Sequence, residues 1–175
     1  MPSGDAGERC GVHLLVRVYI LRVVRDGDAG RVPELRRRAA AAAAQGMSAP
    51  RVGDPARAML RHTLATVAYR AAKCLRGAPS EFATFRASSD TRTAGEMLAH
   101  MGDLIDWAQK MLKGTHEWRP VASKGWSADS ARFHASMQQL DAMLASDEPL
   151  RQLEQVFQGP IADALTHVGQ LTMLR

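Results

Sequence analysis

Apolar side chains recur at steps of three and four residues from Asp54 onward, a spacing that predicts amphipathic helices. The first expected helix begins at Asp54-Pro55, where an N-cap residue precedes a proline in the first helical position. The second begins after Thr93, and Glu96 lies three residues further on, as in a capping box. Both starts are therefore marked by local sequence signals as well as by periodicity.

Two further helical segments follow. The third expected helix opens at Ser127 or Ser130 and runs through Leu144. A short helical piece is expected from Asp147. Gly159-Pro160 should break this piece and restart the chain as the fourth helix, with the proline at its first position.

Four amphipathic segments without a strand pattern between them predict an all-α fold, namely one antiparallel four-helix bundle over residues 54–175. The fourth helix runs to Leu174-Arg175 without a Gly or Asn to end it. We therefore expect the domain either to be truncated at its C-terminal end or to rest on another surface there.

Residues 1–46 do not share this pattern. The apolar run His13–Val24 contains two arginines and is preceded by acids, which is not the order of a signal peptide. The cluster Arg36–Arg38 and six consecutive alanines follow. We expect a flexible or non-native N-terminal extension. Two alternatives are that translation begins at Met47 and that the arginine cluster is a partner-binding arm.

The distribution of charge along the chain does not indicate a nucleic-acid-binding protein. The chain has 23 Lys or Arg and 18 Asp or Glu, a formal net charge of +5. Eight of these arginines and five of the acids lie in residues 1–46, so the remainder is nearly balanced. Its basic residues are not interleaved with aromatic ones, and we expect no nucleic-acid partner. No apolar run approaches the roughly 20 residues that span a bilayer, so no membrane segment is expected.

The two cysteines, Cys10 and Cys74, lie far apart and form no CxxC motif. This argues against a disulfide framework and against a cysteine zinc site. We expect a cytoplasmic protein.

The candidate chemistry lies on the second and fourth helices. Asp163 and His167 are one turn apart, so both side chains leave the same side of the helix and can reach one ion. His100 falls at the border of the second helix's apolar face, whereas His62 falls nearly opposite the apolar face of the first helix and is expected at the surface. Two imidazoles and one carboxylate suit Zn, Fe, Ni or Mn. The alternative is that Asp163 and His167 form a surface ion pair.

Two segments, Leu98–Trp107 and Asp163–Leu171, resemble the signature segments of the DinB/YfiT-like superfamily of four-helix-bundle metalloproteins. The resemblance implies that His100 and His167 match the first and last of three metal-binding histidines. The middle histidine of that pattern is Asp163 here. A carboxylate binds the same metals, so the resemblance implies either a working site of altered affinity or a vestigial one.

The resemblance also implies a reaction class. We expect a divalent-metal-dependent enzyme, a transferase or hydrolase, and most specifically a thiol-dependent S-transferase that acts on a small-molecule substrate with a low-molecular-weight thiol. The catalytic residues stay unassigned. We also expect a homodimer. The alternative function is a non-catalytic helical bundle that dimerises or binds a partner, supported by methionines on the apolar stripes at positions 97, 101, 111, 137 and 143.

Overall fold

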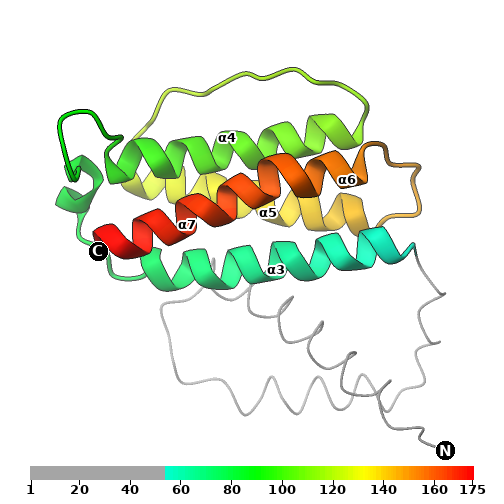
Figure 1. Ribbon diagram of the computed structural model, residues 1–175, viewed down its shortest axis with the longest axis horizontal. Helices are drawn as coiled ribbons and strands as arrows, with labels where there is room; N and C mark the ends of the chain where they lie inside the picture. The colour runs from blue at the N-terminus through cyan, green and yellow to red at the C-terminus, as the bar shows by residue number, and fades with distance from the viewer. Residues whose placement is uncertain (1–53) are drawn as a thin grey trace, which may run out of the picture.

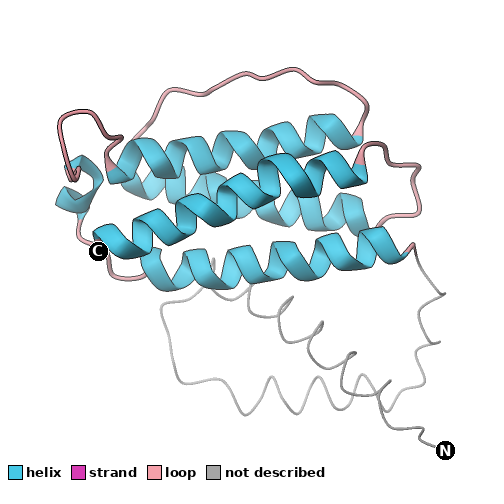
Figure 2. Ribbon diagram, in the orientation of Figure 1, coloured by secondary structure: helices cyan, strands magenta, loops and turns pink. Residues whose placement is uncertain are grey.

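The computed structural model of the protein describes residues 54–175, and all regular structure in that range is helical (Figures 1 and 2). The expectations for residues 1–46 and for Met47 lie outside the described residues. In the range that is described, no helix has both the length and the apolar character needed to cross a membrane. The elements are α3 (Pro55–Leu75), a 3₁₀ turn (Ser80–Thr84), α4 (Ala94–Leu112), α5 (Trp126–Ala145), α6 (Leu153–Val156), a π turn (Phe157–Ile161) and α7 (Ala162–Leu174).

Helices α3 and α4 begin where the sequence signals predict. Asp54 Oδ1 accepts a hydrogen bond from Ala56 N at 2.9 Å, and Pro55 is the first helical residue. Thr93 and Glu96 exchange both bonds of a capping box, at 3.1 Å from Glu96 N to Thr93 Oγ1 and 2.6 Å from Thr93 N to Glu96 Oε2. These bonds satisfy N–H groups that a first helical turn leaves without partners, so both predicted starts are confirmed.

The predicted start of α5 at Ser127 or Ser130 is wrong. The helix begins at Trp126, and its N-cap is Gly125 with φ +98°, a conformation that glycine adopts easily. Asp129, in the first turn, accepts bonds from a backbone N–H and a hydroxyl of the preceding loop at 3.2 and 2.5 Å. An acid inside the helix thus ties the loop to it, and no serine cap is used.

The predicted break at Gly159-Pro160 is also wrong. Helix α6 begins only at Leu153, after the expected Asp147, and the π turn joins it to α7 without interruption. A π turn bonds each residue to the fifth one along, and this wider ring gives room for Pro160, which has no N–H to donate.

Buried positions on this continuous helix show the same turn. Val156, Pro160 and Ile161 are all buried, so two neighbouring positions of the π turn face the core. The buried apolar residues that follow, at positions 164, 168 and 171, are spaced by three or four, as in an ordinary α-helix.

Side-chain contacts give the direction of each helix (Figure 1). Arg57 and Arg61 of α3 contact Ser146 and Asp141 of α5 in reverse order, so these helices are antiparallel. Helices α4 and α5 differ from this pair, because the residue numbers of their contacts increase in the same direction along both helices. Arg132 bonds to Asp103, and four residues later a serine bonds to Asp106. The expectation of an antiparallel bundle is therefore wrong for α4 and α5, which run in the same direction.

The loop of residues 113–125 makes this parallel pairing possible. Figure 1 shows it returning along the whole length of α4. At about 3.3 Å per residue, a fully extended segment of this size reaches roughly 40 Å, whereas a helix of 19 residues such as α4 is about 28 Å long. We call these residues the crossover loop.

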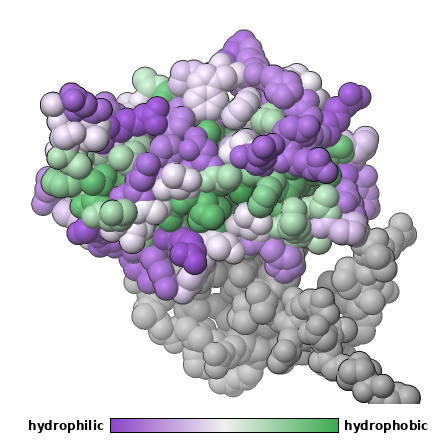
Figure 3. Space-filling model, viewed as in Figure 1, coloured by the Kyte–Doolittle hydropathy of each residue, from purple (hydrophilic) through white to green (hydrophobic). Residues whose placement is uncertain are grey.

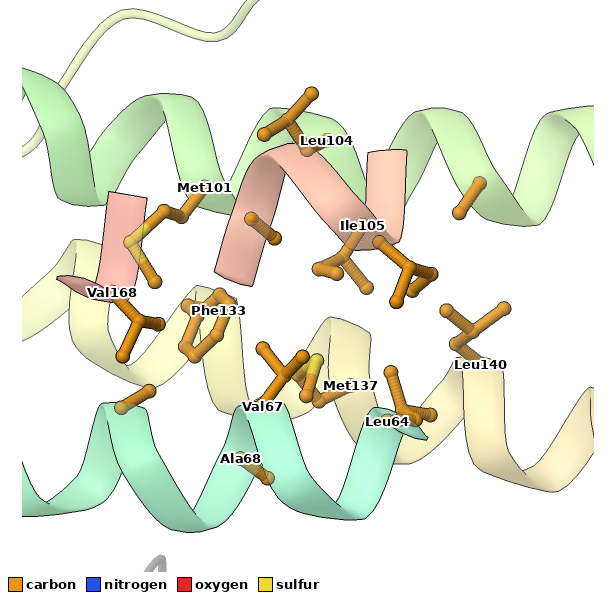
Figure 4. Packing of buried hydrophobic residues seen from close by; sticks show 14 of the residues in the cluster. Leu64, Val67, Ala68, Met101, Leu104, Ile105, Phe133, Met137, Leu140 and Val168 are labelled. Carbon is orange, nitrogen blue, oxygen red and sulfur yellow. The ribbon is translucent and has the colours of Figure 1, made fainter. Parts of the chain in front are cut away.

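The four longer helices pack around one apolar core (Figure 4). Phe133 lies at its centre and is fully buried. Of the five methionines predicted on the apolar stripes, four are buried in this core, and the fifth, Met143, packs against it. The methionines therefore fill the interior and do not form a surface. The face shown in Figure 3 is mostly polar, with an apolar band across its middle.

A polar network joins α4, α5 and the crossover loop. Arg132 Nη1 lies 2.9 Å from Asp103 Oδ1 and 3.1 Å from Asp106 Oδ2, and its Nη2 donates to the Ala99 carbonyl at 2.6 Å. A Cβ on Gly102 would lie 2.7 Å from the guanidinium carbon, so the glycine permits this close approach. The side chain of Asp103 is only 5% exposed, which makes its pairing with a cation necessary.

We predict that Arg132→Ala lowers the free energy of unfolding by about 3 kcal/mol, because it leaves the Asp103 carboxylate buried without its cation. The matched control is Arg61→Ala. Arg61 pairs with Asp141 at 2.8 Å, but both side chains are nearly a fifth exposed, so about 1 kcal/mol is expected. Urea denaturation of the two variants measures both losses. Equal losses would contradict the prediction.

Candidate metal centre

The structure brings the three predicted ligands together. His100 projects from α4, and Asp163 and His167 project from α7, which packs against α4. His100 Nε2 lies 3.6 Å from Asp163 Oδ2, and His167 Nε2 lies 3.4 Å from Asp163 Oδ1. One donor atom from each residue lies within 4.8 Å of the other two.

These separations are close to those of a metal site. Donor atoms about 2.0 to 2.1 Å from a tetrahedral ion lie about 3.4 Å apart. The two contacts to Asp163 are close to that spacing but involve different carboxylate oxygens, and one donor atom from each residue lies within 4.8 Å of the others. A small inward movement of the imidazoles would complete the set, so the donor types and their placement fit a divalent ion.

The π turn places Asp163 in this position. It ends at Ile161, two residues before the carboxylate, and it changes the rotation of α7 relative to α6. Trp107 of α4 packs near the same turn, since a Cβ built on Gly159 would lie 3.9 Å from its ring. Residues 100 and 163–167 therefore face each other in two antiparallel helices. π turns occur often at functional sites because they re-aim side chains in this way.

Gln170 fixes the orientation of His167. The Nδ1 atom of His167 lies 2.7 Å from Gln170 Oε1, one turn further along α7. An amide oxygen only accepts hydrogen bonds, so Nδ1 carries the proton. The lone pair is then on Nε2, which faces Asp163. Metal-binding histidines commonly have such a partner on the other ring nitrogen.

The surroundings keep His100 neutral. Burial lowers its pKa, the charge of Arg92 and that of His167 when its ring is protonated lower it further, and Asp163 opposes them. Neutral imidazole is the form that ligates a metal. The side chain of Asp163 is 47% exposed while that of His167 is 9% exposed, so the cluster has a buried side and a side open to solvent.

Two tryptophans border the cluster. The ring of Trp118, from the crossover loop, lies edge-to-face against the ring of His100 with centroids 5.6 Å apart. It makes the same kind of contact with Trp107, also at 5.6 Å. The resembled segments include Trp107 and Gln170, but no sequence signal marks Trp118.

The remaining described histidines lie elsewhere. His62 is exposed on α3, as predicted, and His116 is exposed in the crossover loop. His134 is buried in α5, where its Nδ1 lies 2.7 Å from the Ser130 carbonyl oxygen. Its Nε2 is buried and meets no partner among residues 54–175. It is therefore a core histidine, and His13 lies outside the described residues.

The chain was compared with protein-family models, with curated proteins and with solved structures, and none of the three gave a match. The family resemblance therefore stays a prediction.

We predict that burial of His134 makes the fold acid-sensitive. Burial lowers its pKa below the ordinary value of 6.5, so the unfolded chain binds more protons than the folded one as the pH falls. Stability should decrease below about pH 6.5, and His134→Gln should reduce that decrease. Urea denaturation at several pH values between 7.5 and 5 measures how the free energy of unfolding changes with pH in the parent protein and in the variant. The same pH dependence in both proteins would contradict the prediction.

Proposed function

We propose that residues 54–175 form a four-helix bundle of the DinB/YfiT-like type that holds one divalent metal ion with His100, Asp163 and His167. The convergence of these three side chains from two helices is the observation that carries the proposal. A surface ion pair would need only Asp163 and His167. The placement of His100 Nε2 at 3.6 Å from the same carboxylate supports a three-donor site instead.

The types of donor atom limit which metal ions the site can bind. Two neutral imidazoles and one carboxylate suit Zn, Fe, Ni or Mn, whereas Mg and Ca prefer sites made only of oxygen. Asp163, which replaces a histidine of the resembled pattern, adds a negative charge. With a divalent ion the site would retain a net charge of +1. That charge favours an anionic substrate group such as a thiolate.

For the reaction, we propose a thiol-dependent S-transfer. A bound divalent ion supplies Lewis-acid chemistry, which lowers the pKa of a thiol and polarises an acceptor. The protein contributes the orientation of the donors through Gln170, the shielding of His167 from water, and an open side at Asp163 through which small molecules enter. The balanced reaction joins the thiol sulfur to an electrophilic carbon, releases the leaving group and gives the thiol proton to solvent.

The alternative of a non-catalytic partner-binding bundle loses its supporting feature. The methionines that suggested an adaptable binding surface are buried in the core or pack against it. The metal content of the protein decides between the two functions.

We predict that the full chain binds about one divalent ion per molecule and that His167→Ala or Asp163→Ala abolishes stoichiometric binding. Asp163→His should keep it, because a third imidazole also ligates these metals. The matched control is Thr166→Ala, since Thr166 is exposed and only bonds to its own helix. Metal is measured after reconstitution with Zn, Fe, Ni and Mn. Absence of metal from the parent protein under all four conditions would refute the site.

The Gln170→Ala variant tests how much the hydrogen bond to His167 contributes to metal affinity. It leaves all three ligands in place but removes the hydrogen bond that orients His167. We expect metal affinity to fall about 10- to 100-fold, as is typical when such a partner is lost. Competition with a chelator measures the change. An unchanged affinity would show that the hydrogen bond has no role in metal binding.

We further predict that the metal-loaded chain accelerates the reaction of glutathione or cysteine with monochlorobimane, in which a C–S bond replaces a C–Cl bond. The metal-free chain and the His167→Ala variant should leave the rate at its uncatalysed value. Fluorescence of the thioether product follows the reaction. Metal binding without any acceleration, with either thiol, would separate the site from this reaction class.

A further inference from the structure

The crossover loop is anchored on both sides of Trp118. Before it, Glu117 pairs with Lys110 of α4 at 3.7 Å. After it, the backbone N–H of Val121 donates to Asp103 Oδ1 at 3.1 Å, and this carboxylate is itself held by Arg132. The loop is therefore tied to α4 at two points that bracket the tryptophan.

These two ties hold the indole next to the candidate metal centre. One edge-to-face contact is with a predicted ligand, His100. The other is with Trp107, seven residues further along α4. Although packed in this way, Trp118 remains 41% exposed. It therefore presents apolar surface to solvent beside His100, one of the three predicted ligands.

The neighbouring residues of the loop make this surface distinctive. Glu117 and Arg119, on either side of Trp118, form an ion pair with each other. A structural lid would need only to cover His100, and a smaller side chain would serve. An indole that is held by two ring contacts and is still 41% exposed is suited to contact an aromatic or aliphatic group of a bound molecule.

We propose that Trp118 is a substrate-contacting residue that selects an acceptor with an aromatic or other apolar group beside the reacting atom. The inference rests on the proposed metal site and adds to it the class of substrate. The reacting group lies at His100, Asp163 and His167, and the apolar part of the acceptor packs on the exposed part of the indole.

Two small chelators test this inference without measuring turnover. Benzohydroxamate and acetohydroxamate bind a metal through the same group, but one carries a phenyl ring and the other a methyl group. On the metal-loaded full chain, we expect benzohydroxamate to bind roughly tenfold more tightly, a difference of the size that an aromatic contact with burial gives. Calorimetry of both ligands on each variant measures the ratio of dissociation constants.

In the Trp118→Ala variant the ratio should fall to about twofold or less, while metal content and acetohydroxamate affinity stay unchanged. Trp118→Phe should retain most of the preference. The matched control is Val121→Ala, since Val121 lies on the same loop, is 42% exposed and donates to Asp103 through its backbone. This variant should keep the full ratio.

The outcomes separate the two proposals. A protein that loads no metal refutes the proposed site, and the substrate inference falls with it. A protein that loads metal but binds both hydroxamates equally, or keeps its preference in Trp118→Ala, refutes the substrate inference alone. Loss of acetohydroxamate affinity in Trp118→Ala would show that the tryptophan only supports His100, and this also overturns the inference.

Discussion

Asp103 is an acid inside the helical packing, and its side chain is 5% exposed. A carboxylate there is tolerated only with a cation and hydrogen-bond donors, and Arg132 and the Val121 N–H supply them. The cation comes from α5 and the N–H from the crossover loop. One buried charge therefore fixes the parallel pairing of α4 and α5 and the path of the loop between them.

The candidate site inherits its geometry from the same constraint. Helix α4 carries His100 three residues before Asp103, and the loop that Asp103 holds carries Trp118. On the opposite side, the π turn determines which face of α7 meets α4. The three donors thus come together through backbone features that are independent of any ion, which is the condition for a preorganised site.

The sequence predicted the all-helical fold and the starts of α3 and α4, because these rest on periodicity and on local caps. It also predicted that Asp163 and His167 would lie together, because a pair one turn apart on a helix keeps that relation in any packing, whereas the place of His100 beside them was predicted from its position at the border of the apolar face and from the family resemblance. The direction of α5 was missed, since it depends on a contact between residues far apart in sequence. So was the hydrogen bond from His167 to Gln170, which depends on side-chain rotamers. The role of Gly159-Pro160 was misjudged, because these two residues also carry the usual signals of a helix break.

The π turn has a consequence for how the C-terminal helix tolerates insertions and deletions. Helix α6 directs Val156 into the core and α7 directs Ala164 and Leu171 there, and in a regular α-helix Val156 would lie about 80° around the axis from Ala164. The π turn acts as a phase shift that lets both segments face the core within one unbroken helix. A single insertion or deletion between them would force one segment to rotate by about 100°. The longer α7 holds more buried contacts, so α6 would turn outward while the candidate site kept its register.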